Sequence, residues 1–83
     1  MEPTDEQVVK TAAEAAEGLI FSRYSRSDVD DLDVTVRFED GVLKIDVYLN
    51  AGEESEQVAE DSVRAAESAV DELFEESESY SSR

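Results

Sequence analysis

Residues 32–49, LDVTVRFEDGVLKIDVYL, alternate apolar and polar side chains on both sides of Asp40-Gly41. An Asp-Gly pair between two alternating runs is a strong signal for a type I′ turn, because both central residues of that turn need a positive φ. Side chains along a strand point to its two faces in turn, so each run has one apolar and one polar face. The stretch therefore predicts an antiparallel β-hairpin with its turn at residues 40 and 41.

The turn and the apolar pattern predict the same register for this hairpin. Pairing outward from the turn sets Glu39 opposite Val42 and ends with Leu32 opposite Leu49. In this register the apolar residues of both runs share one face: Leu32, Val34, Val36, Phe38, Leu43, Ile45, Val47 and Leu49. A slip of one residue would turn the apolar set of one strand to the opposite face. We therefore expect the shared apolar face to be covered.

A helix is predicted before the hairpin, over residues 4–24. Thr4 followed three residues later by Gln7 has the pattern of a capping box. Apolar residues then recur at the spacing of one helix face: Val8, Val9, Ala12, Ala13, Ala16, Leu19, Ile20 and Tyr24. Residues 25–32 are a polar connector, in which one option is a single turn capped by Ser27.

A second helix is predicted after the hairpin. Its apolar stripe begins at Val58 and ends at Phe74, and it includes Ala59, Ala66 and Ala69. Asn50, Gly52 and Ser55 are the alternatives for its N-cap. Residues 77–83 are polar and rich in serine and acidic residues, and we expect them to form a disordered tail after a single domain over residues 1–76.

The order helix, strand, strand, helix predicts an α+β fold, a two-layer α-β-β-α sandwich with both helices on one face of the hairpin. The alanine stripes favour close approach of the two helices. A two-stranded sheet leaves both of its edges unpaired. We therefore expect a homodimer in which hairpin edges pair into a four-stranded sheet. The alternative is a monomer whose edges are protected by the charges of Asp33, Lys44 and Asp46.

The charge balance predicts a salt-rich environment. The chain has 23 Asp and Glu against 7 Lys and Arg, a formal net charge of −16 over 83 residues. Carboxylates this dense repel one another strongly, but at 1 M salt the Debye length is only about 3 Å. Free nucleic acid is an unfavourable partner for so negative a chain. No apolar run approaches the roughly 18 residues of a membrane span, and we expect a cytoplasmic protein without a leader or a membrane anchor.

The sequence predicts no catalytic residue, no metal site and no cofactor. It contains no His and no Cys, the residues that most often serve as metal ligands, bases and nucleophiles. Counting a calcium-binding EF-hand loop from Asp28 places Glu39 at the required twelfth position, but Asp33 stands where the loop needs glycine. No phosphate-binding glycine loop is present. We therefore expect a protein that is not an enzyme.

Five residues are candidates for an interaction surface: Phe21, Arg37, Val42, Lys44 and Tyr48. Arg37 and Lys44 lie opposite each other on the polar face of the hairpin, which Val42 and Tyr48 share. Phe21 lies off the main stripe of the first helix, where it either covers Val29 or Leu32 or belongs to a partner surface. A solvated, charge-balanced sheet face remains the alternative to a binding surface.

These features favour a small non-enzymatic protein-interaction or assembly module adapted to high salt, acting as a homodimer or as part of a larger assembly. The alternative is an RNA- or ribonucleoprotein-associated protein that uses Arg37 and Lys44. Proteins that bind RNA on a sheet face present several stacking aromatic residues there, and here only Tyr48 is available.

The stretch Ser25-Arg26-Ser27-Asp28-Val29-Asp30-Asp31-Leu32-Asp33-Val34-Thr35-Val36, between an Ala/Glu-rich helix and a hairpin, resembles the archaeal domain-of-unknown-function family 3194. The similarity covers the chain from the first helix to about Phe74. It implies an archaeal protein, and the acidic bias indicates a haloarchaeon. Members of that family are often encoded near prefoldin and transcription or translation components, which implies a context of information processing or protein assembly. The family supplies no functional residue that can be transferred.

Overall fold

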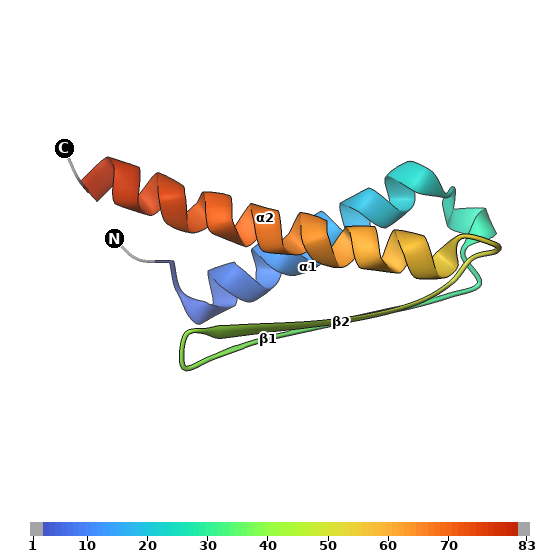
Figure 1. Cartoon of the computed structure of the whole chain (residues 1–83), viewed down its shortest axis with the longest axis horizontal. Helices are drawn as coiled ribbons and strands as arrows, with labels where there is room; N and C mark the ends of the chain where they lie inside the picture. Colours follow the sequence, from blue (N-terminus) through green and yellow to red (C-terminus); the bar gives the residue numbers. More distant parts are fainter. Residues whose placement is uncertain (1–2, 82–83) are drawn as a thin grey trace.

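The computed structural model describes the backbone of residues 3–81 and the side chains of residues 3–76. Helix α1 spans Asp5–Arg23, a 3₁₀ turn η1 spans Arg26–Asp28, strands β1 and β2 span Asp31–Glu39 and Val42–Asn50, and helix α2 spans Ser55–Ser81. Both helices lie on one side of the hairpin and run in opposite directions (Figure 1). The predicted α+β architecture, a hairpin with two helices on one face, is confirmed.

The hairpin has the predicted turn and the predicted register. Asp40 and Gly41 have φ angles of 51° and 77°, the left-handed values that a type I′ turn requires at both central residues. Every strand pair from Glu39–Val42 to Leu32–Leu49 is found as predicted. At the open end, the backbone N–H of Asp30 donates to the carbonyl of Asn50 at 2.9 Å.

Helix α1 starts with the predicted capping box. The N–H of Gln7 donates to the Thr4 hydroxyl at 3.1 Å, and the Gln7 side-chain carbonyl accepts from the Thr4 N–H at 2.9 Å. These two bonds satisfy backbone donors that have no partner inside the helix. The reciprocal bonds explain why the predicted and observed starts differ by one residue only.

The links differ in detail from the prediction. The turn η1 begins after Ser25, whose hydroxyl donates to the Asp28 carboxylate at 2.8 Å, so Ser27 lies inside the turn and does not cap it. Before α2, the Ser55 hydroxyl accepts from the N–H of Ala51 at 2.9 Å and donates to the Gly52 carbonyl at 2.8 Å. Among the three predicted caps, Ser55 is thus the residue whose side chain holds the link to the helix.

Helix α2 continues beyond the expected domain end. A disordered tail was predicted over residues 77–83, whereas α2 extends to Ser81, and residues 82 and 83 lie outside the described residues. The sequence after Phe74 contains neither Gly nor Pro, and the acidic residues Glu75, Glu76 and Glu78 are good helix formers. Loss of the apolar stripe therefore does not end the helix.

The core lies where the two helices meet above the hairpin. One buried cluster joins the two helices and comprises Val8, Ala12, Ala16, Ala66 and Val70. A second cluster at the open end of the hairpin comprises Ile20, Leu49, Ala51 and Val58. Ala12, Ala16 and Ala66 have no exposed surface, so the small side chains permit close helix contact as predicted. Ser62 is also fully buried, and its hydroxyl donates to the Ala59 carbonyl at 2.6 Å.

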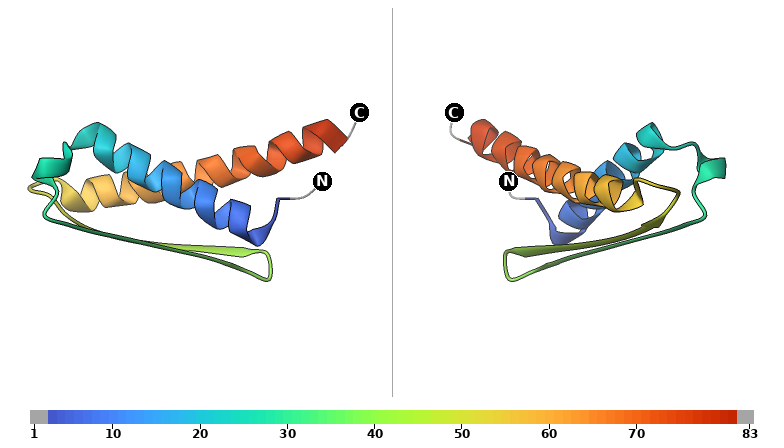
Figure 2. Two further views of the ribbon diagram at one scale, coloured as in Figure 1. Left: turned by 180° about the vertical axis from the view of Figure 1, so that it is seen from behind. Right: turned by 45° about the vertical axis from the view of Figure 1, so that its right-hand side comes forward.

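The apolar sheet face is turned to the helices but is incompletely covered. Burial alternates along both strands, and the inward positions are the eight predicted apolar residues. Of these, only Leu49 is buried, with 8% of its surface exposed. The two helices cross each other, and each moves away from the hairpin toward its C-terminal end (Figure 2). In a single copy, the inward side chains of both strands therefore keep part of their surface in contact with water.

Candidate interaction surface

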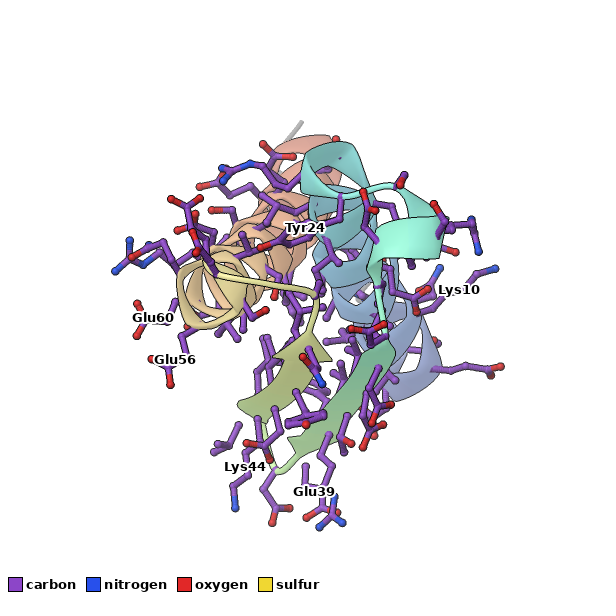
Figure 3. The ribbon with its side chains drawn as sticks, turned by 90° about the vertical axis from the view of Figure 1, so that its right-hand side faces the viewer. Lys10, Tyr24, Glu39, Lys44, Glu56 and Glu60 are labelled. Atoms are coloured by element: carbon purple, nitrogen blue, oxygen red, sulfur yellow. The ribbon has the colours of Figure 1, made fainter. Side chains whose placement is uncertain are left out.

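The outer sheet face is the side of the hairpin that points away from the helices. It is formed by alternate residues of the two strands: Asp31, Asp33, Thr35, Arg37, Glu39, Val42, Lys44, Asp46, Tyr48 and Asn50. All ten are exposed. The side chains of Glu39 and Lys44 extend from the hairpin on the side opposite the helices (Figure 3). No element in the described range 3–81 covers this face.

Arg37 and Lys44 lie directly opposite each other on the outer sheet face. Like charges in directly opposed positions destabilise an antiparallel pair. Among the described side chains the one ion pair joins Arg23 to Asp61, at 3.5 Å, so neither cation has a carboxylate partner. Among the described side chains, no ion pair offsets the repulsion between these two cations.

A shallow depression surrounds this pair near the turn. It is lined by Arg37, Glu39, Asp40, Val42 and Lys44 and has a volume of about 290 Å³. Pockets that enclose small molecules have volumes of roughly 300–1,000 Å³ and are mainly apolar. This open, charged depression suits a contact with another surface better than enclosure of a substrate.

Val42 and Tyr48 are the two large apolar side chains that the described part of the chain leaves exposed, with 54% and 56% of their surface accessible. Both belong to β2, and Lys44 and Asp46 lie between them on the same face. Strand β1 instead presents charged and hydroxyl side chains on this face. The apolar contribution to the outer sheet face is therefore confined to β2.

Phe21 does not join the other four candidate residues. It lies on α1, on the opposite side of the hairpin from the outer sheet face, and the Arg26 guanidinium carbon lies 4.7 Å from its ring centroid. This is the distance of a cation–π contact. Arg26 belongs to the 3₁₀ turn η1 and not to α1, so the periodicity of α1 gave no signal for the contact.

The two strand edges carry unpaired backbone groups. Glu39 and Val42 flank a two-residue turn and exchange backbone hydrogen bonds, and from there hydrogen-bonded and non-hydrogen-bonded pairs alternate. The groups that point outward therefore belong to the inward-facing residues: Leu32, Val34, Val36 and Phe38 on β1, and Leu43, Ile45, Val47 and Leu49 on β2. The described sheet has two strands only, so both edges are free to pair.

Asp46 lies on the outer sheet face between two of the candidate residues, although it is not itself one of the candidates. It lies between Lys44 and Tyr48 on β2, and its cross-strand neighbour is Thr35. The signal that identifies it is positional, because residues two apart on a strand share a face.

The acidic connector does not form a metal site in the described residues, where no group of three or more Asp, Glu, His or Cys side chains converges. Asp28 accepts a hydrogen bond from Ser25, and Asp33 belongs to the outer sheet face. Within residues 3–81, neither helix combines the length and the apolar character that crossing a membrane requires.

Comparison with known proteins gives one family and one related fold. The family model described as "Protein of unknown function (DUF3194)" matches residues 3–80. An uncharacterised protein of the halophilic archaeon Natronomonas pharaonis is 60% identical over 76 residues, which cover 89% of this chain and 92% of that protein. A crystal structure from Thermococcus onnurineus NA1 has a TM-score of 0.76 and 25% sequence identity, covering 95% of this chain and 86% of that one.

Proposed function

The chain belongs to the DUF3194 family of proteins of unknown function, and we propose that it is a non-enzymatic protein-interaction module of a salt-rich cytoplasm. The observation that carries this proposal is the outer sheet face. It combines two exposed apolar side chains, Val42 and Tyr48, with the unpartnered cations Arg37 and Lys44. Exposed apolar groups among polar ones are typical of surfaces that bind other proteins.

The shape of this surface favours binding over catalysis. A catalytic site needs groups held around a reacting atom in a space from which water is excluded. The depression beside Arg37 and Lys44 is open and lined mainly by exposed charged side chains. A protein partner can bind such a surface without being enclosed.

The partner that this module fits first is a second copy of the chain. Both hairpin edges present unpaired backbone groups, and a two-stranded sheet is of marginal stability by itself. Edge pairing would supply hydrogen bonds and cover part of the half-exposed inward side chains. The same edges and the outer sheet face leave room for further subunits of a larger assembly.

The high charge supports activity at molar salt. A net charge of −16 with a single described ion pair leaves most carboxylates without a cation beside them. The similarity to a protein of a halophilic archaeon agrees with this environment. In such salt the long-range repulsion between two acidic chains is largely screened.

The competing function is RNA binding at Arg37 and Lys44, and a chemical-shift titration separates it from protein binding. In about 2 M KCl, raising the concentration of ¹⁵N-labelled protein is expected to shift amide signals of β2 and the outer sheet face. Adding a single-stranded RNA oligonucleotide to dilute protein is expected to leave these signals unchanged, because the electrostatic contribution to RNA binding falls with salt.

High salt can suppress RNA binding, so the same titration is repeated at about 0.1 M KCl as a control. Saturable shifts at Arg37, Lys44 and Tyr48 with RNA, and none with protein concentration, would contradict the proposed function. That outcome would favour an RNA-associated protein.

A further inference from the structure

We infer that the second copy pairs through the β2 edge, antiparallel, with Ile45 of the two copies facing each other on the two-fold axis. This inference rests on the proposed self-association and specifies its edge and register. It makes one four-stranded sheet in the order β1-β2-β2-β1, with all helices on the same side.

The backbone permits this register. The outward-pointing groups of β2 belong to Leu43, Ile45 and Val47, because the pairs with β1 alternate from the turn. Centring on Ile45 makes Ile45 hydrogen-bond with Ile45 of the other copy, and Leu43 with Val47. On the inward face the pairing then brings half-buried apolar side chains together.

The outer sheet face provides the specificity. In this register Lys44 of one copy lies opposite Asp46 of the other, twice because of the symmetry. Val42 lies opposite Tyr48 in the same way. These are non-hydrogen-bonded pairs, in which the Cα atoms approach to about 4.5 Å and side chains contact most closely. Lys44 then has Asp46 of the other copy on one side, which offsets the repulsion from Arg37 on its other side. The contact between Val42 and Tyr48 of the two copies removes part of the surface of both exposed apolar residues from water.

Other registers of the same edge lose this complementarity. One strand can slide along the other only in steps of two residues, because its outward-pointing backbone groups recur at every second residue. The smallest such step in either direction moves the two-fold axis from Ile45 to Lys44 or to Asp46. Either shift places two like charges directly opposite each other, which is unfavourable.

The β1 edge is a poorer match. Centring β1 on Thr35 pairs Asp33 with Arg37 favourably, but it also sets Asp31 opposite Glu39 twice. Centring it on Val34 sets Asp31 opposite Arg37, but neither register forms an apolar pair on the outer sheet face. Pairing β1 of one copy with β2 of the next leaves a free edge at each end, so the assembly would not close. The β2 edge centred on Ile45 is the arrangement that combines two oppositely charged pairs with two pairs of the exposed apolar residues on the outer sheet face, without a repulsive pair.

Amide hydrogen exchange on the unmodified protein tests the edge directly. In about 1 M KCl, concentrated protein is expected to exchange the amides of Leu43, Ile45 and Val47 about tenfold or more slowly than dilute protein. The amides of Val34, Val36 and Phe38 point outward from β1 and serve as the internal control. Their exchange is expected to change little with concentration.

Charge reversal tests the register. Asp46→Lys sets two lysines opposite each other, and is expected to raise the dissociation constant of the dimer about tenfold or more, because two symmetric pairs are lost. Adding Lys44→Asp to that variant recreates the pair with its charges exchanged and is expected to restore association. Asp33→Lys makes the same change in net charge on the same face of β1, and is expected to leave association unchanged.

Each outcome separates the register from the proposed function. Protection of the β1 amides with concentration, or loss of association in Asp33→Lys, would overturn the β2 register while leaving self-association standing. Association that Lys44→Asp does not restore would overturn the Ile45-centred alignment. No concentration-dependent protection of either edge would overturn the register and the proposed self-association together.

Discussion

Replacement of Ile20 by alanine is expected to lower the free energy of unfolding by about 3–4 kcal/mol, because it removes a buried side chain and leaves a cavity. Ile20 has no exposed surface and belongs to the cluster at the open end of the hairpin with Leu49, Ala51 and Val58. A domain of this size is stabilised by only about 5–10 kcal/mol. This single substitution therefore removes a large part of the total stability, as denaturant unfolding in about 2 M KCl will measure.

Leu19→Ala is the matched control for this prediction. Leu19 is the neighbouring residue, has an isomeric side chain and packs only partly buried against the same cluster. We expect a loss of about 1–2 kcal/mol, since less apolar surface returns to water. Equal losses for the two variants, or a loss below about 1 kcal/mol for Ile20→Ala, would contradict the described core.

The second large effect concerns salt. Lowering KCl from about 2 M to about 0.1 M is expected to reduce the melting temperature of dilute protein by on the order of 10–20 °C. At 0.1 M the Debye length is about 10 Å, so carboxylates on neighbouring turns and elements repel one another. The net charge of −16 and the single described ion pair leave this repulsion without compensation. Thermal unfolding followed by circular dichroism measures the change.

A triple variant tests whether charge causes this salt dependence. Glu56, Glu60 and Glu67 are exposed on α2, and the first two extend from the flank of the helix (Figure 3). Replacing all three by glutamine keeps their size and removes three negative charges. We expect the variant to lose less stability than the unmodified chain when salt is lowered. The same salt dependence in both proteins would contradict an electrostatic cause.

The hairpin could be predicted in detail because two independent signals agree on it. Asp40-Gly41 specifies a turn with two positive φ angles, and the alternation on either side specifies which face is apolar. Each signal alone permits slips, but only one register satisfies both. The start of α1 was predictable for a similar reason, since Thr4 and Gln7 cap it through reciprocal bonds.

The rest depended on information that periodicity does not contain. The extent of α2 differs from the prediction, because the apolar stripe stops at Phe74 while the helix continues to Ser81. The contact of Phe21 with Arg26 depends on how the chain turns after α1. The degree of burial under the helices was also not predictable, because it follows from the angle at which the helices cross the hairpin.

The candidate surface was predictable as a face but not as a complete set. Strand alternation places Arg37, Val42, Lys44 and Tyr48 together on one face, with Asp46 between two of them, and the structure has all five on this face. Phe21, which lies off the main apolar stripe of α1, is on the other side of the hairpin from these residues. Binding through this surface stays a prediction.

Light scattering coupled to size-exclusion chromatography in about 2 M KCl tests self-association most directly. We predict a molar mass that rises with protein concentration to twice the 9.2 kDa of one chain. A molar mass that stays at that of one chain up to millimolar concentration would contradict self-association through the hairpin edges.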